Sequence, residues 1–489
     1  MIDGENSILP IVTFDANTTW VDLYRIAQPE LEKPGLQKLV AALNTSVKCV
    51  AVERHYIDKD YRDTFFNFHS KRFSTPNSRC LRLHFFNRSI ARAELKESTK
   101  VNGAYLGYSI IRPTKPNCIG RTLLDPVSRG PASGFAALCE EHVSILGCEL
   151  KIRGFPFISQ DADVTVCAQS ALWMLLRYYS NRYNVYPETY PFQIGNLTKD
   201  YSVGRVVPTS GLYVWQMAEA LRRLGFGSVI YTRALYRTQF DHLLYTYVES
   251  GIPVLAGTKD HVLVAFGHRS DFSITPPAAP GPIFTSQFNS ALIINDDNAV
   301  PYQLLHENGA ISGPGAQSSR FKFTDVVDFV VPLPEKVFLP AEGFKTVVTA
   351  ILEKSDEFGV KVLSPELQKE RLVLRLFLTS GRSFKKHLAE RGMGHPQVED
   401  MYRNLPLPHF IWVCEISHAS HYAKHEILGE ILWDATRNAS EPNGWIALHY
   451  PEILVTDVGS ALNGLQKFFK INLQNSKPYP VYRNNLHPI

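Results

Sequence analysis

The order of apolar and polar residues predicts a long amphipathic helix in the first half of the chain. Over residues 166–179, Ala168, Leu172, Leu175 and Tyr179 fall at positions i, i+4, i+7 and i+11, which places them on one face of a helix. An apolar stripe of this kind is typical of a helix that packs against a core. Similar signals predict further helices at residues 34–44, 58–68, 212–224, 237–249, 341–353 and 381–391.

Clusters of β-branched and aromatic residues next to turn signals predict strands between these helices. The predicted strands lie at residues 47–54, 79–85, 105–112, 228–232, 253–257, 261–267, 291–295, 372–378, 409–416, 427–433 and 445–448. Helices and strands are therefore interspersed along the chain, and we predict an α+β fold.

Turn-rich segments divide the sequence into three regions. The segment PVSRGPASG closes a first region at about residue 132, and VPLPEK opens a third region after residue 332. We predict accessory α+β regions of unknown role at residues 1–132 and 333–489, and a domain that carries the chemistry at residues 133–332. Within that domain, the proline-rich stretch at residues 273–289 is predicted to be a surface loop beside a cleft.

The composition is that of a globular protein and excludes disordered or fibrous classes: the chain of 489 residues has 45% hydrophobic and 20% charged residues. Lys+Arg 51 against Asp+Glu 47 leaves a net charge of +4, so the bulk charge indicates neither nucleic-acid nor membrane binding. No apolar run approaches the roughly 18 residues of a membrane span, and the first residues lack a signal-peptide pattern. We therefore expect a soluble, cytoplasmic protein.

One stretch of the first region is more basic than the rest of the chain. Residues 51–129 contain 15 Lys/Arg against seven Asp/Glu. This stretch could bind an acidic partner protein, but we favour a solvated surface whose charge is balanced elsewhere in the fold.

Seven cysteines form an odd set without a CxxC pair, which argues against a disulfide framework or a zinc ribbon. Six of them are expected to be small buried residues, namely Cys49, Cys80, Cys118, Cys139, Cys148 and Cys414. Cys167 differs because it lies in the first turn of the predicted helix. There the free backbone N–H groups favour the thiolate, which is the nucleophilic form. Asp163 and Thr165 are predicted to cap this helix.

A nucleophilic cysteine requires a base and an orienting group. His261, at the start of a predicted strand, is the preferred base, and His268 at the other end of that strand is its rival. Asp296 or Asp297, directly after the next strand, would orient the imidazole. Alternation along the strand favours Asp296 and directs Asp297 to solvent.

An oxyanion donor completes this set of predicted site residues. Gln160, upstream of Cys167, carries a side-chain amide suited to that role, and the backbone N–H of Cys167 would be the second donor.

Gln, Cys, His and Asp in this order resemble the papain-like cysteine peptidases, in particular the compact bacterial type related to the double-glycine leader peptidases of bacteriocin exporters. Further matching segments are Tyr178–Tyr179, Leu224–Phe226, Gly251–Val254, His261–Gly267 and Asn295–Asp296. The resemblance covers about residues 155–302. It implies a helix carrying the cysteine, packed on an antiparallel sheet that carries the histidine and the aspartate. Ala168 departs from the family, which usually has glycine after the cysteine.

We therefore predict a cysteine peptidase that cleaves a peptide or isopeptide bond in a peptide or protein substrate, with Cys167, His261, Asp296 and Gln160 as its site residues. The alternatives are an acyltransferase on the same fold and an inactive scaffold that binds a peptide or protein.

No cofactor or metal is predicted for this chemistry. His418, His421 and His425 could supply zinc ligands, but their surroundings indicate a polar hairpin loop.

Overall fold

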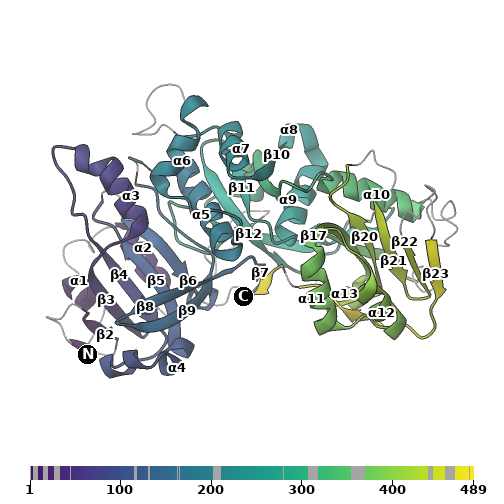
Figure 1. The fold of residues 1–489 in the computed structure, drawn as a ribbon, viewed down its shortest axis with the longest axis horizontal. Helices are drawn as coiled ribbons and strands as arrows, with labels where there is room; N and C mark the ends of the chain where they lie inside the picture. Colours follow the sequence, from purple (N-terminus) through teal and green to yellow (C-terminus); the bar gives the residue numbers. More distant parts are fainter. Residues whose placement is uncertain are drawn as a thin grey trace.

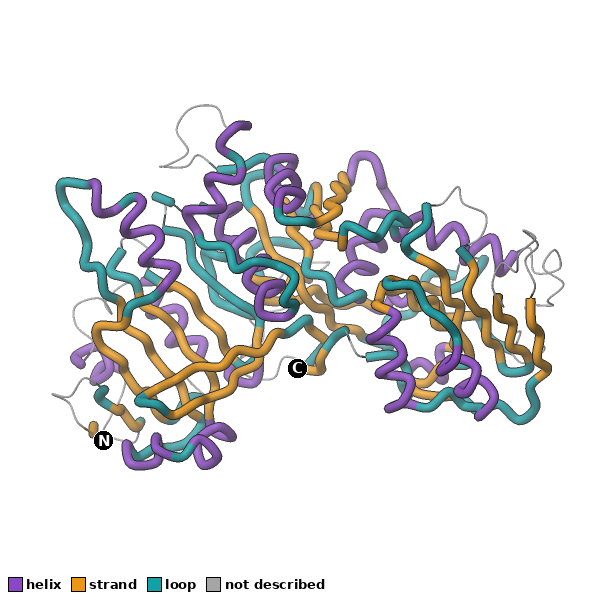
Figure 2. Tube along the Cα trace, in the orientation of Figure 1, coloured by secondary structure: helices purple, strands orange, loops and turns teal. Residues whose placement is uncertain are grey.

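The computed structural model describes most of the chain. The described residues are 2–3, 9–14, 20–26, 34–43, 46–114, 118–129, 133–161, 163–164, 166–201, 211–278, 280–306, 318–353, 369–438, 444–457, 468–483 and 485–489. Over these residues the fold is mixed α+β, as predicted, and its larger sheets form an elongated row from the N-terminal to the C-terminal part of the chain (Figures 1 and 2). We call them the N-terminal, central and C-terminal sheets.

The N-terminal sheet has the strand order β1-β2-β3-β4-β5-β6, so each strand pairs with its neighbour in sequence. Its strands are β1 (Ile2–Asp3), β2 (Ile11–Thr13), β3 (Cys49–Tyr56), β4 (Cys80–Phe86), β5 (Tyr105–Ile111) and β6 (Ile119–Leu124). The helices between them are α1 (Trp20–Ile26), α2 (Pro34–Leu43), α3 (Lys59–Asn67) and α4 (Ser98–Val101). Asp58 caps α3 by accepting a hydrogen bond from the Tyr61 N–H at 2.9 Å.

A hairpin of β8 (Cys139–Ile145) and β9 (Cys148–Gly154) packs against β5 and β6 of this sheet. The Tyr108 hydroxyl donates to Glu141 at 2.9 Å, and Arg82 donates to the Ser144 carbonyl at 2.6 Å. The predicted boundary at residue 132 therefore falls before a hairpin that packs on the N-terminal sheet.

The central sheet has the order β10-β16-β11-β12-β14-β15, and every pair in it is antiparallel. Its strands are β10 (Phe226–Thr232), β11 (Val254–Gly257), β12 (Val262–Ser270), β14 (Asn289–Asn295), β15 (Gln303–His306) and β16 (Asp328–Pro334). Beside β12, the short β7 (Phe135–Ala136) also pairs with β25 (His487–Pro488), which is the end of the chain.

Side chains of β12 alternate between two covered faces. Val262, Val264 and Phe266 belong to the core that contains helix α5 (Cys167–Arg182), whereas Leu263 and Ala265 belong to the core that contains α9 (Phe240–Glu249). Because both faces of the strand are buried there, residues 262–266 form a continuous apolar run. The other helices of this part are α6 (Pro191–Leu197), α7 (Val214–Arg223) and α8 (Arg233–Tyr236).

The C-terminal sheet has the order β13-β17-β18-β20-β21-β22-β23. Its strands are β13 (Ile283–Phe284), β17 (Leu372–Ser380), β18 (Phe410–His418), β20 (Gly429–Asp434), β21 (Trp445–Tyr450), β22 (Ile453–Asp457) and β23 (Phe468–Asn472). The helices of this part are α10 (Ala341–Glu353), α11 (Gly381–Arg391), α12 (Pro396–Asn404) and α13 (Ala419–Tyr422), and β19 (Glu426–Ile427) pairs with β24 (Tyr479–Pro480). β13 belongs to the proline-rich stretch at residues 273–289 and pairs in parallel with β17. This stretch therefore adds a strand to the C-terminal sheet and then leads into β14 of the central sheet.

Buried polar contacts join the N-terminal part to the central part. Arg177 of α5 lies 2.7 Å from the Asp60 carboxylate of α3, and Trp173 donates to the same carboxylate at 2.9 Å. The Tyr302 hydroxyl donates to the Leu124 carbonyl at 2.6 Å and accepts from the Phe155 N–H at 2.9 Å. The helix that carries Cys167 is thus fixed to the N-terminal part.

Several cations of the basic stretch at residues 51–129 pair with carboxylates that lie beyond it. These pairs are Lys59–Glu188, Arg72–Asp163, Arg112–Asp161 and Arg121–Glu141. Part of the excess charge is therefore balanced within the fold. Among the described residues, no helix is both long and apolar enough to cross a bilayer.

Candidate functional site

Cys167 is the first residue of helix α5, as predicted, and its side chain is half-buried. The segment before it is fixed by Asp161, whose Oδ1 accepts from the backbone N–H groups of Asp163 and Val164 at 3.0 and 2.8 Å. Arg112 holds the other Asp161 oxygen at 3.5 Å. Asp161 therefore binds the backbone of Asp163 and Val164 shortly before the helix begins.

The predicted cap by Asp163 is wrong. The N-cap residue is Val166, in extended conformation and without a side-chain hydrogen bond, while the Asp163 carboxylate pairs with Arg72 at 3.0 Å. Asp163 is too far upstream because the helix begins at Cys167; Thr165, the other predicted cap, lies outside the described residues. Because Cys167 is the first residue of α5, the positive end of the helix dipole lies beside it and favours negative charge there.

His261 is the last residue of the tight connection between β11 and β12. Both the backbone N–H and the hydroxyl of Thr258 donate to the His261 carbonyl, at 2.8 and 3.2 Å. His261 is only 8% exposed, and the Phe321 ring stacks on its imidazole with centroids 5.5 Å apart. The backbone and one face of the imidazole are thus both held in place.

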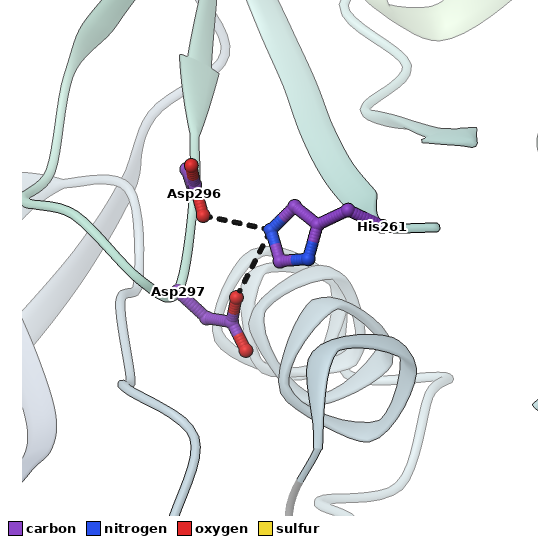
Figure 3. Close-up of side chains that lie close together, drawn as sticks. All are labelled: His261, Asp296 and Asp297. Atoms are coloured by element: carbon purple, nitrogen blue, oxygen red, sulfur yellow. Dashed lines mark hydrogen bonds and ion pairs between the residues drawn. The ribbon is translucent and has the colours of Figure 1, made fainter. Parts of the chain in front are cut away.

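Two carboxylates meet one nitrogen of this imidazole (Figure 3). Nε2 of His261 lies 2.7 Å from Oδ1 of Asp296 and 3.3 Å from Oδ1 of Asp297. The predicted contact with Asp296 is therefore present. The expectation that Asp297 points to solvent is wrong, because its side chain is 1% exposed. Strand β14 ends at Asn295, so side-chain alternation no longer applies in the turn that follows.

These contacts shift the pKa values of all three groups. Burial alone would lower the pKa of His261, but its hydrogen bonds to Asp296, Asp297 and Cys167 raise it to about 11. Burial likewise opposes the ionisation of Asp296, yet the bond from His261 leaves its pKa below the usual value. For Asp297 burial prevails, and its pKa is raised. The imidazole is therefore charged at neutral pH.

Gln160 also reaches this site, through a residue that the sequence analysis missed. Its side-chain amide donates to Oδ1 of Asn298, and the Asn298 N–H donates to Asp296 at 3.0 Å. A chain of hydrogen bonds thus runs from Gln160 through Asn298 and Asp296 to His261. Asn298 directly follows the paired aspartates, and this is the signal that could have identified it.

Cys167, His261 and Gln160 line one open cleft of about 740 Å³. Arg320 and Phe321 also line this cleft. The Arg320 guanidinium lies over the Phe321 ring at 4.6 Å, and its Nε is 3.6 Å from Asp296. No sequence pattern near Phe321 indicated this position, because its contact with His261 depends on how the chain folds back onto the cleft.

The rival base, His268, lies elsewhere. It is near the other end of β12, where its Nε2 contacts the buried Glu249 at 3.0 Å, and it does not line the cleft with Cys167. The structure therefore brings together Cys167, His261, Asp296 and Gln160, and leaves His268 outside.

In the described part of the chain, one group of side chains could together bind a metal ion. Donor atoms of His261, Asp296 and Asp297 all lie within 4.8 Å of one another. Histidine and carboxylates suit a divalent cation, but the 2.7 Å contact between Nε2 and Asp296 has the length of a charge-assisted hydrogen bond, in which the imidazole donates to the carboxylate. Across the same described residues, His418, His421 and His425 do not gather donors in this way.

A thiol, an imidazole and a side-chain amide thus line one open cleft, and such groups can together carry out acyl transfer through sulfur. Comparison of the chain with protein-family models, with curated proteins and with solved structures finds no match.

Proposed function

We propose that this chain is a cysteine peptidase with a papain-like core, cleaving a peptide or isopeptide bond through Cys167, His261 and Asp296. One observation carries the proposal. Cys167 at a helix start and His261 at a strand start line the same cleft, and the thiol contributes to the raised pKa of the imidazole. The helix α5 packs on β12 of an antiparallel sheet, as the sequence resemblance implies for such a core.

The imidazole presents its two nitrogens to different partners in this proposal. Nε2 is held by Asp296, which leaves Nδ1 for the thiol and the substrate. Because the pKa of His261 is raised to about 11, the resting state at neutral pH is an imidazolium beside the cysteine. An imidazolium stabilises a neighbouring thiolate, which is the form that attacks a carbonyl.

The reaction then has two halves. The Cys167 thiolate attacks the substrate carbonyl, and the oxyanion accepts hydrogen bonds from the Gln160 amide and the Cys167 backbone N–H. His261 donates its proton to the leaving amine as the C–N bond breaks, which leaves an acyl-thioester. The neutral imidazole then takes a proton from water and becomes the imidazolium again as hydroxide adds to the thioester. The tetrahedral intermediate collapses, the C–S bond breaks, and the Cys167 thiolate and the carboxylic acid product separate.

The same residues would also support acyl transfer to an amine in place of water. An inactive scaffold that binds a peptide in the cleft is the alternative from another class. Neither requires a different geometry, so the experiment has to measure turnover and the fate of the acyl group.

The test incubates the full chain with a peptide library, with and without added amines, and follows products by mass spectrometry. Cys167→Ala and His261→Asn serve as inactive controls. We expect cleavage that iodoacetamide abolishes and that a chelator leaves unchanged. Cleavage that persists in Cys167→Ala, or that requires a divalent cation, would overturn the proposal. Binding of peptides without turnover would favour the scaffold.

A further inference from the structure

A second cavity opens near the end of β12 that lies opposite His261. It has a volume of about 250 Å³ and is lined by residues of β7, the end of β12, β17 and the C-terminal segment around Arg483. Figure 1 shows β7 and the C-terminus beside β17 at this junction of the central and C-terminal sheets. The cavity shares no residue with the cleft around Cys167.

One buried carboxylate, Glu249, lines this cavity, and its charge is already compensated. Its Oε1 accepts from Arg375 at 2.6 and 2.8 Å, while Oε2 accepts from the Tyr245 hydroxyl at 2.6 Å and lies 3.0 Å from His268. Burial raises the pKa of Glu249, but Arg375 and His268 lower it overall, so the carboxylate stays ionised. Both of its oxygens are therefore already bound by protein groups.

Two further cations, Arg269 and Arg483, line the same cavity. Among the described residues, neither guanidinium has a carboxylate within 4.0 Å. Arg483 is half-buried, and both its desolvation and the nearby Arg375 lower its pKa. A partly desolvated cation beside another cation is stabilised when an anion binds.

Aromatic rings form the rest of the wall. The Arg483 guanidinium lies over the Phe135 ring at 5.3 Å, and Phe272 meets Tyr422 edge to face at 5.6 Å. Phe272 is 37% exposed although it is a large apolar side chain. These rings can contact a flat apolar group while the guanidinium groups bind its charge.

We propose that this cavity binds a small organic oxyanion, a carboxylate or phosphate attached to an aromatic ring, with Arg483 and Arg269 on the charge and Phe272 beside the ring. The volume lies below the 300–1,000 Å³ of most small-molecule sites. A fragment-sized ligand therefore fits, and a peptide or nucleic-acid chain does not. The proposal does not depend on the activity proposed for Cys167.

The test titrates the full chain with phenyl phosphate, benzoate, inorganic phosphate and phenol, measured by calorimetry and by the melting temperature. Phenyl phosphate and benzoate should bind saturably and raise the melting temperature, and phenol should not. Arg483→Gln should weaken binding of both anions by about tenfold, since a charge-assisted hydrogen bond contributes about 1.5–3 kcal/mol and 1.4 kcal/mol is tenfold.

Control variants distinguish anion binding in this cavity from a general effect of positive surface charge. Arg403→Gln, which removes an exposed arginine paired with Glu399, should bind the anions as the wild type does. Arg269→Gln repeats the test if Arg483→Gln lowers the melting temperature without ligand. Cys167→Ala should bind normally. The proposal is overturned if phenol or inorganic phosphate binds as tightly as phenyl phosphate. It is also overturned if no anion binds, or if the cavity variants bind the anions as tightly as the wild type does.

Discussion

Oδ1 of Asp297 lies 3.3 Å from Nε2 of His261, the same nitrogen that Asp296 binds at 2.7 Å. One ring nitrogen therefore faces two carboxylates, of which Asp296 has a lowered pKa and Asp297 a raised one. The two aspartates are adjacent in sequence but differ in the charge they contribute. Asp296 supplies the negative charge beside the imidazole, and Asp297 is the more easily protonated of the two.

Substitution of the two aspartates should therefore have unequal effects. Asp296→Asn removes the shorter, charge-assisted bond and should lower kcat by about 100-fold, whereas Asp297→Asn should lower it by about tenfold. Steady-state kinetics on a substrate found in the library screen would measure both, with circular dichroism as a control for folding. Equal losses would contradict the assignment of Asp296 as the principal partner.

Alkylation should single out Cys167. It is half-buried, whereas the other six cysteines are buried, and burial raises the pKa of the Cys139 thiol to about 12. Iodoacetamide at pH 6 should therefore modify the peptide that contains Cys167 first, as followed by mass spectrometry. His261→Asn should slow this reaction by removing the imidazolium. Comparable labelling of Cys414 in the folded protein would show that Cys167 has no special reactivity.

The charge on His261 should also make a pH-dependent contribution to stability. Its pKa rises from the ordinary 6.5 in the unfolded chain to about 11 in the folded one, so the folded state binds the proton more tightly. The resulting stabilisation is complete below about pH 6.5 and is lost as the pH rises towards 11. Urea unfolding of the wild type and of His261→Asn should be measured at pH 6.5, 8.5 and 10. The difference between their free energies of unfolding should become smaller as the pH rises. A difference that grows with pH would contradict a raised pKa of His261 in the folded state.

Breaking the buried pair between α3 and α5 should cost more than breaking an exposed one. Asp60→Ala leaves the buried Arg177 and Trp173 without this carboxylate, and we expect a loss of about 3–5 kcal/mol in the free energy of unfolding. Glu97→Gln, which removes the exposed partner of Lys100, should cost under about 1 kcal/mol. Denaturant unfolding of both variants measures the two losses in the free energy of unfolding. Similar losses would mean that the buried pair contributes little to holding α3 and α5 together.

Local sequence patterns predicted the elements that carry the candidate site. Helical spacing located the helix that begins at Cys167, and the short apolar strands located His261 and Asp296 at strand ends. These features depend on a few neighbouring residues, so periodicity is sufficient to find them. The papain-like core and the peptidase activity stay predictions, since they rest on the resemblance and on the geometry of the cleft.

Features that depend on distant parts of the chain were not predicted. The Phe321 ring covers His261 from a segment that follows the site residues in sequence, and Asp297 turns inward because the strand has ended. Strands β7, β13 and β25 have two residues each, too few for any periodic pattern. Their positions follow from tertiary packing rather than from local preference.

The pairing of β25 with β7 has a consequence for the order in which the central sheet forms. His487 and Pro488 pair with β7, which itself pairs with β12 at Gly267 and His268. This corner of the central sheet therefore joins segments that are far apart in sequence. Closing so long a loop costs chain entropy before the pair contributes stability, so we expect β25 to join the sheet late in folding.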